Sequence, residues 1–196
     1  MKSNKSKLFI ISGSTASSKD TTLNELSNRG VVKTLLSTTT RPIRATEEQG
    51  REYNFVTEEE FNEIYFIEKR IYKVANGDNW LYGLSYKEIC KCYENFGNYA
   101  VILDVQGMRA IKEFVNKEFK NEVEVITIML KASYYTRINR YLNRDNVTDD
   151  MVKEAIRRMN ADMHEIEPFI NEYDIVLRSE DDDLERNIKI IKSLCE

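Results

Sequence analysis

A short run of small residues, 13–20, ends in a lysine and an aspartate and could bind phosphate. The pattern G-x-x-x-x-G-K-[S/T] is met at Gly13 and Lys19, whereas Ser18 replaces the second glycine and Asp20 replaces the hydroxyl residue. Small residues let backbone N–H groups converge on phosphate oxygens, and the N-terminus of a following helix and the lysine add positive charge. The residues expected to contact the phosphates of a nucleotide are Gly13, Ser14, Thr15, Ala16, Ser17, Ser18, Lys19, Asp20 and Thr21.

The two departures from that pattern have physical consequences. If position 18 needs a left-handed backbone, Ser18 costs about 1 kcal/mol relative to glycine. Asp20 offers a hard oxygen ligand that could hold Mg²⁺ directly or through water, and Thr21 or Thr22 could supply a hydroxyl instead. The alternative interpretation is a Ser/Thr-rich turn between strand and helix that binds no ligand.

A second cluster, which runs from Ser37 to Tyr53, could enclose one phosphate. Arg41 and Arg44 lie three residues apart, and arginine presents a fixed fork of donors that matches phosphate oxygens. The hydroxyls of Ser37 and Tyr53 could complete the enclosure. The alternative interpretation is a polar surface loop in which the arginines occur by chance.

The elements that would position these residues alternate between strands and helices. Apolar runs predict buried strands at 8–12, 99–103, 123–130 and 175–177, with a further apolar run at 31–36. Helices are predicted at about 19–29, 106–117, 134–144, 149–170 and 182–195. This alternation is typical of an α/β fold with a parallel sheet that helices cover on both faces.

Residues 37–85 break the alternation and are predicted to form a small mixed insertion that carries a binding site. Thr57 with Glu60 forms a capping box that opens one helix, and Ser85 with Glu88 forms another that opens a helix to about residue 96. The runs 71–75 and 80–82 flank Asn76-Gly77, which predicts a β-hairpin.

Composition excludes several classes of function. The chain has 196 residues with a net charge of -4, which suggests one compact domain and disfavours general nucleic-acid binding by charge. No apolar run approaches the roughly 18 residues of a membrane span, and no signal peptide is recognisable, so neither a membrane nor secretion is expected. The three cysteines do not have the number or spacing of a disulfide framework, which favours a reducing, cytoplasmic location. The presence of a single histidine, His164, argues against His-based metal sites and Ser-His-Asp catalysis.

Taken in order along the chain, the motifs resemble those of guanylate kinases. Residues 37–56 reproduce S-x-T-T-R-x-x-R-x-x-E-x-x-G-x-x-Y-x-F-V, the GMP-binding segment of that family. Tyr82-Gly83 is similar to the family's Tyr-Tyr-Gly-Thr segment, and residues 103–107 are similar to its strand end L-D-[IV]-D-[VM]-Q-G. Tyr173-Asp174 and the Asp-rich start of the last helix also fit.

The resemblance implies a P-loop NTPase-type fold that transfers phosphate from Mg-ATP to GMP or dGMP. It implies a core of residues 1–36 and 86–196, a helical lid at about 137–158 and a nucleoside monophosphate-binding insertion at 37–85. The implied GMP-binding residues are Ser37, Arg41, Arg44, Glu47, Tyr53, Glu68, Tyr82 and Asp104. The implied catalytic residues are Lys19, Arg140, Arg144, Arg158 and Asp104, with Asp20 as the candidate Mg²⁺ ligand.

Basic residues in the expected lid have a simpler alternative explanation. Arg137, Arg140 and Arg144 follow near-helical spacing and could lie on a solvated helix face. The resemblance instead implies that lid arginines neutralise charge on the transferring phosphoryl group.

The chain also departs from the family pattern at positions that contact the two bases. Guanylate kinases place a glutamate about nine residues before the equivalent of Tyr82, which gives Lys73 here; Glu68 would serve if the segment before the hairpin is longer. Ile102 replaces one aspartate and Ser179 replaces an asparagine. The acceptor could therefore be another nucleoside monophosphate, or the chain could be a relative that only binds phosphorylated peptides.

Overall fold

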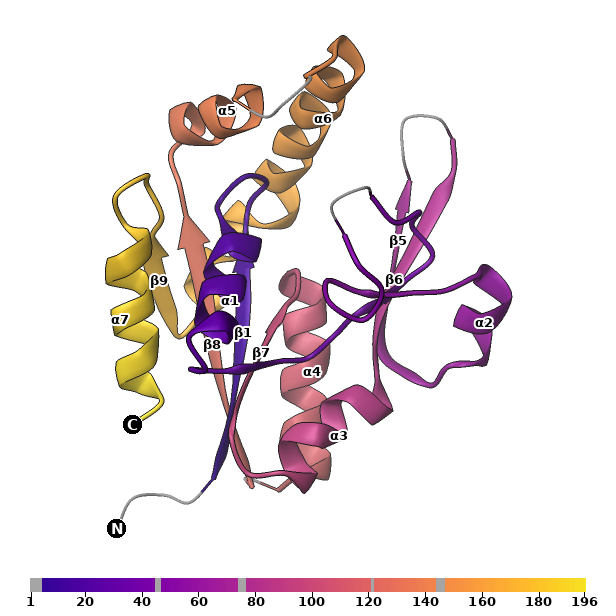
Figure 1. Ribbon diagram of the computed structural model, residues 1–196, viewed down its shortest axis with the longest axis vertical. Coiled ribbons are helices and arrows are strands. Elements are labelled where there is room, and N and C mark those ends of the chain that lie inside the picture. Colours follow the sequence, from indigo (N-terminus) through magenta and orange to yellow (C-terminus); the bar gives the residue numbers. More distant parts are fainter. Residues whose placement is uncertain (1–4, 45–46, 74–76, 121, 144–146) are drawn as a thin grey trace.

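The computed structural model describes residues 5–44, 47–73, 77–120, 122–143 and 147–196 (Figure 1). Within these residues the larger sheet holds five parallel strands in the order β2-β7-β1-β8-β9. They are β1 (Ser6–Gly13), β2 (Lys33–Thr34), β7 (Asn98–Ile102), β8 (Val123–Lys131) and β9 (Ile175–Arg178). The apolar run at 31–36 therefore contributes only a two-residue strand at the sheet edge.

The central strand β1 is apolar on both faces, without the alternation of apolar and polar residues that a half-exposed strand shows. Leu8 and Ile10 pack into one apolar cluster, and Phe9 and Ile11 pack into the other. All four side chains are fully buried because successive residues of a strand point to opposite faces, and both faces of this sheet are covered.

Helices cover both faces of the parallel sheet. The helices α1 (Lys19–Asn28) and α7 (Leu184–Leu194) contribute to the cluster around Phe9. The helices α3 (Tyr86–Glu94) and α4 (Val105–Glu118) contribute to the cluster around Leu8. The predicted α/β fold class is confirmed.

A second, smaller sheet stands to one side of the first (Figure 1). Its order is β4-β3-β6-β5, from β3 (Thr38–Thr39), β4 (Asn54–Phe55), β5 (Phe66–Lys73) and β6 (Asn79–Ser85). The pair β5–β6 is antiparallel, as the predicted hairpin requires, although part of the predicted turn lies outside the described residues. The short helix α2 (Glu58–Glu63) begins with the predicted capping box of Thr57 and Glu60.

Two further helices, α5 (Tyr134–Leu142) and α6 (Asp149–Glu165), lie beyond the end of the sheet at which β1 runs into α1 (Figure 1). The prediction of one helix over 149–170 was wrong, because α6 stops at Glu165 and a 3₁₀ helix, η1 (Glu167–Glu172), follows. Pro168 lies in the first turn of η1, where its missing N–H and its ring prevent the α-helix from continuing.

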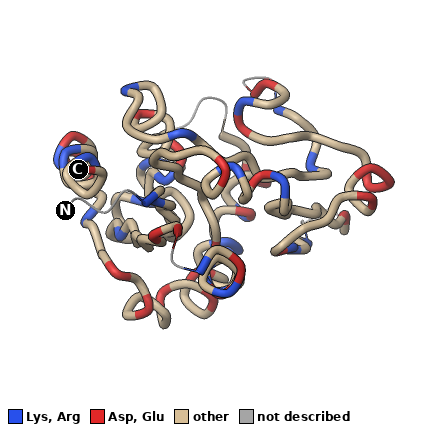
Figure 2. Tube along the Cα trace, turned by 90° about the horizontal axis from the view of Figure 1, so that it is seen from below, with Lys and Arg blue, Asp and Glu red and all other residues tan. Residues whose placement is uncertain are grey.

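Acidic and basic residues are interspersed over the molecule (Figure 2). No helix among the described residues has the length and apolar character needed to cross a bilayer.

Candidate functional site

The phosphate-binding loop joins the end of β1 to the start of α1. At its first residue, Gly13, a Cβ atom would lie 2.6 Å from the carbonyl oxygen of Leu130, so only glycine fits against the neighbouring strand β8. The loop therefore leaves the sheet at the glycine with which the predicted phosphate motif begins.

Two residues of this loop adopt left-handed backbone conformations without being glycine. The φ angle is 61° at Ala16 and 64° at Ser18. Such a conformation costs an L-residue about 1–2 kcal/mol. Left-handed residues in a loop allow successive N–H groups to face one point, which makes an anion-binding concavity. The strain anticipated at position 18 is present, and Ala16 adds a second strained position that the sequence did not reveal.

Lys19 lies in the first turn of α1 with its ammonium folded back over the loop. Its Nζ donates to the carbonyl oxygen of Ser14 at 3.0 Å. Burial lowers the pKa of Lys19, and the charges of Asp20 and Asp162 oppose that shift. Because a partly desolvated ammonium gains more from a nearby phosphate than an exposed one, the position suits a donor-phosphate contact.

Hydroxyl groups of Ser17 and Thr22 are buried, and neither finds a hydrogen-bond partner within the described residues. Asp20, between them in sequence, is exposed. The described part of the chain holds no cluster of three or more acidic, histidine or cysteine side chains that could bind a metal unaided. One carboxylate supplemented by phosphate oxygens and water is the usual environment of Mg²⁺, so the residues fit that ion.

Arg41 is the centre of the second predicted phosphate site, which is called the acceptor side below, and is only 4% exposed. Its Nε donates to the Tyr82 hydroxyl at 3.0 Å, and another nitrogen donates to Glu47 at 2.8 Å. Its guanidinium also lies over the ring of Tyr53, 5.6 Å from the centroid. Strands β3, β4 and β6 of the smaller sheet lie beside these residues and hold them together.

Arg44 forms the exposed side of this cluster. Its backbone N–H donates to Glu47 at 2.9 Å, and its side chain, 58% exposed, lies 3.9 Å from the carboxylate of the same Glu47. Burial raises the pKa of Tyr53, and the charge of Asp20 adds to that shift. Asp20 and Tyr53 also line the same cavity.

Glu68 on β5 is 7% exposed and lies beside the start of α4. A Cβ atom on Gly107 would lie 3.4 Å from its Oε2. Burial raises the pKa of Glu68 to about 7, with a further contribution from the nearby charge of Asp104. Lys73, the residue nine positions before Tyr82, is exposed at the far end of β5. Glu68, rather than Lys73, therefore lies near Asp104.

Asp104 is held by two residues that sequence reasoning missed. Its Oδ1 caps α4 by accepting from the Gly107 N–H at 2.7 Å. Its Oδ2 accepts from Arg70 Nε at 3.0 Å and from the Tyr72 hydroxyl at 3.2 Å. Residues 68, 70 and 72 share one face of β5, so period-two alternation from Glu68 could have found both.

The arginines expected in the lid lie at different distances from the loop. Arg140 donates to the carbonyl oxygen of Ala16 at 3.3 Å and pairs with Asp181 at 3.0 Å. Arg158 pairs with Glu154 on α6, and its charge lowers the pKa of Lys19. Arg144 lies outside the described residues.

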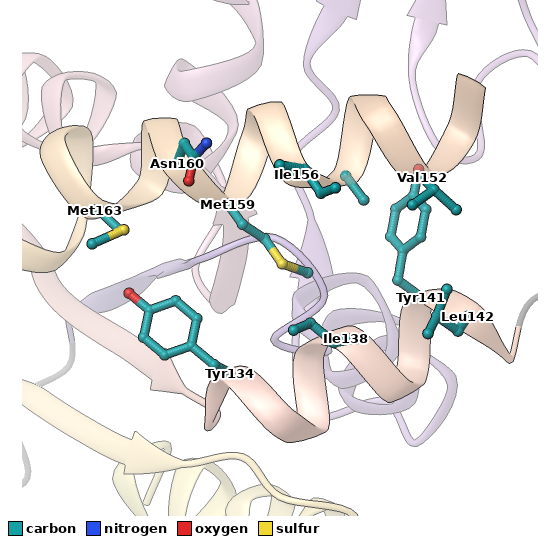
Figure 3. Close-up of a pocket in the computed structure, with 10 residues that line it drawn as sticks. Tyr134, Ile138, Tyr141, Leu142, Val152, Ile156, Met159, Asn160 and Met163 are labelled. Atoms are coloured by element: carbon teal, nitrogen blue, oxygen red, sulfur yellow. The ribbon is translucent and has the colours of Figure 1, made fainter. Parts of the chain in front are cut away.

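A cavity of about 60 Å³ lies where the phosphate loop meets the acceptor side. Its lining includes Asp20 and Asn24 from α1, Ser37 and Tyr53 from the acceptor side, and Ile102 from the end of β7. A larger pocket of about 350 Å³ lies between α5 and α6 (Figure 3). Figure 3 shows side chains such as Ile138 and Met159 facing each other there, and this mainly apolar lining offers no charged group to a phosphate.

The parallel sheet carries a phosphate loop at its end, and a second site centred on an arginine lies beside that loop. Together these features define a P-loop phosphotransferase that binds two phosphorylated ligands. The family described as "Guanylate kinase" matches residues 5–196. The chain therefore belongs to the guanylate kinase family.

Similar proteins support this assignment. A guanylate kinase of Malacoplasma penetrans is 31% identical over 184 residues, which are 92% of this chain and 88% of that protein. A guanylate kinase of Thermotoga maritima is 30% identical over 194 residues, which are 96% of this chain and 87% of that protein. The crystal structure of guanylate kinase from Anaplasma phagocytophilum shares the fold with a TM-score of 0.59, at 22% identity over 99% of this chain and 86% of that one.

Proposed function

We propose that the protein is a guanylate kinase that transfers the γ-phosphoryl group of ATP to GMP or dGMP, giving ADP and GDP or dGDP. The observation that carries the proposal is the shared cavity: Asp20 of the phosphate loop and Tyr53 of the arginine site line the same space. A donor and an acceptor bound on its two sides have their phosphates adjacent, as direct transfer requires.

On the donor side, the segment 13–21 binds the ATP phosphates through N–H groups other than those of Thr15 and Ser17, which bond to Asp162 and Ser14. Lys19 contacts the phosphoryl group that moves. Asp20 holds Mg²⁺ together with phosphate oxygens and water, and Thr22 offers a buried hydroxyl next to it. When bound, the ion neutralises charge on the β- and γ-phosphates.

On the acceptor side, four groups bind the GMP phosphate: Arg41, Arg44, Tyr53 and Tyr82. Glu47 holds Arg41 in place through the 2.8 Å ion pair. Arg44 is the exposed member, and an incoming phosphate would compete with Glu47, 3.9 Å away, for its side chain.

The guanine base is bound beyond the phosphate. Glu68 accepts from its N1–H and amino group, Ser37 faces the base, and Asp104 lies beside it. Arg70 and Tyr72 fix the position of Asp104. This arrangement supports GMP over AMP, because adenine lacks an N–H donor at N1.

Transfer needs no covalent intermediate with the protein. A phosphate oxygen of GMP attacks the γ-phosphorus in line, and the bond to the β-phosphate oxygen of ATP breaks. Lys19, Arg140, Arg144 and Arg158 stabilise the charge spread over the transferring group. The segment at about 137–158 acts as a lid over the core (1–36 and 86–196), and it closes with the 37–85 insertion to exclude water.

The proposed setting of the enzyme follows from its chemistry. The three cysteines, all in described segments, are free thiols, which supports a reducing location such as the cytoplasm. The net charge of -4 supports small nucleotides rather than nucleic acids as partners.

The test is an ADP-release assay with Mg-ATP against GMP, dGMP, AMP, dAMP, CMP and UMP. Turnover confined to GMP and dGMP is expected. Lys19→Ala is the control, and its kcat should fall by roughly 10²–10³ because a preorganised charge is lost. Turnover with another monophosphate would show that the acceptor is not GMP. A folded protein without turnover on any of them would favour a protein that only binds its ligands.

A further inference from the structure

We infer that Arg137 and Asp162 are positioning residues that hold the phosphate loop in its anion-binding conformation from outside. The inference rests on the donor half of the proposed function. It concerns two side chains on α5 and α6 that the proposed reaction does not itself use.

The two residues form hydrogen bonds with the backbone carbonyl and the backbone N–H of Thr15. Arg137 Nε donates to the Thr15 carbonyl oxygen at 2.8 Å, and the Thr15 N–H donates to Asp162 Oδ2 at 2.7 Å. A second guanidinium nitrogen of Arg137 pairs with the same Asp162 oxygen. The three residues therefore form a closed ring of contacts between the loop and both helices.

This ring is buried rather than solvated. Arg137 is 1% exposed and Asp162 is 6% exposed. Arg137 also donates to Glu167 at 3.0 Å and lies over the ring of Tyr134, so the solvated helix face considered from spacing does not describe it. Burial raises the pKa of Asp162, and the Thr15 N–H and Arg137 oppose that shift.

Burial makes a purely stabilising role a poor explanation. Apolar residues of similar size often replace a buried ion pair with no loss of stability, because desolvation cancels most of the attraction. Apolar residues cannot form hydrogen bonds with the Thr15 backbone. We therefore attribute the positioning of the loop to Arg137 and Asp162.

The loop needs such support because its conformation is strained. Ala16 and Ser18 have φ angles of 61° and 64° without being glycine. Adjacent carbonyls are also held from outside: that of Ala16 accepts from Arg140, and that of Ser17 accepts from Ser179 at 2.9 Å. The carbonyl oxygens of residues 15–17 are thus engaged outward, and among the N–H groups those of Thr15 and Ser17 are bonded to Asp162 and to Ser14. These contacts fix the backbone of the loop, and we expect the N–H groups at the start of α1 to face phosphate.

The test compares R137M/D162L with the wild-type protein. ATP binding is measured by calorimetry without acceptor, and KM is measured separately for ATP and GMP. We expect a folded variant whose affinity for ATP falls about tenfold, the effect of losing one or two positioning hydrogen bonds, with KM for GMP unchanged. The matched control is R29Q/E185Q, which removes an exposed ion pair between α1 and α7 and should change neither constant.

Adding S18G to R137M/D162L separates positioning from packing. Glycine takes a left-handed φ without strain, so ATP affinity should recover most of its loss. Unchanged ATP affinity in R137M/D162L, or a loss that S18G leaves in place, would overturn the inference. If R137M/D162L does not fold, D162N, which keeps an oxygen for the Thr15 N–H, should show a smaller change of ATP affinity in the same direction, and no change would overturn the inference. Failure of the proposed function looks different, since the wild-type protein would then not bind ATP or not phosphorylate GMP.

Discussion

At the scale of single residues, we expect the ionisation of Glu68 to govern binding of the acceptor base. Burial, with the charge of Asp104 nearby, raises its pKa to about 7. Only the carboxylate accepts from both N–H donors of guanine, so kcat/KM for GMP should fall about tenfold per pH unit below pH 7 and level off above it. The measurement is a pH profile of wild type and Glu68→Gln. A wild-type profile that is flat across pH 7, or a Glu68→Gln variant that keeps the slope, would contradict the assignment.

The same carboxyl makes folding stability depend on pH. Its pKa is higher in the folded protein than the ordinary value of 4.5, so the folded state binds more protons between pH 4.5 and about pH 7. Stability should therefore decrease as pH rises through this window, by about 3 kcal/mol in all. Urea unfolding should show Glu68→Gln to be more stable than wild type near pH 8 and similar to it near pH 4. The opposite sign would mean that Glu68 is well solvated or paired.

Arg41 is expected to act on ground-state binding of the monophosphate. It would contact a phosphate that is present before and during transfer, so Arg41→Ala should raise KM for GMP and leave kcat largely intact. Because the change leaves Glu47 without its 2.8 Å partner, a thermal unfolding curve must accompany the kinetics. An unaltered KM in folded protein would show that the acceptor phosphate lies elsewhere.

At the scale of elements, the unit of β1, loop and α1 carries strain that one substitution can relieve. Ser18 sits at the N-cap of α1 with φ 64° and makes no side-chain capping bond there. Ser18→Gly should therefore stabilise the protein by about 1 kcal/mol, measured by denaturant unfolding. A loss of stability would mean that the serine hydroxyl contributes more than the left-handed backbone costs.

Local signals along the chain identified most of the elements. The capping box of Thr57 and Glu60 is present, and the apolar run around Leu8 forms the central strand. Both signals depend on neighbouring residues only, which is why one sequence suffices to read them. The end of α6 was missed although Pro168 marks it, because the apolar pattern continues past the proline.

Features that depend on contacts between distant segments were less predictable. The spacing around Arg137 is that of a solvated helix face, because nothing local reveals that a loop peptide and Asp162 converge on it. Likewise the choice between Glu68 and Lys73 depended on hairpin length, which is fixed by the pairing of Arg70 with Tyr82 across β5 and β6. The roles assigned to the site residues remain predictions.

At the scale of the whole molecule, the acceptor-binding insertion and the α5–α6 pair lie on different sides of the phosphate loop, with one cavity beside Asp20 and Tyr53 and another between α5 and α6. We expect joint binding of GMP and a non-hydrolysable ATP analogue to draw these parts together and to lower the radius of gyration in X-ray scattering, whereas GMP alone should have a smaller effect. Binding at about 100 times Kd should also add about 2.7 kcal/mol to stability. An unchanged radius with both ligands bound would argue against closure.

The central position of β1 also shapes how the chain can fold as it leaves the ribosome. Its two neighbours in the sheet, β7 and β8, come from residues 98–102 and 123–131, so β1 has no partner in this sheet until about half of the 196 residues exist. At roughly 5–20 residues per second that interval is on the order of ten seconds. During it the segment Leu8-Phe9-Ile10-Ile11 is an apolar strand with both edges open, the kind of segment that chaperones bind and that otherwise aggregates.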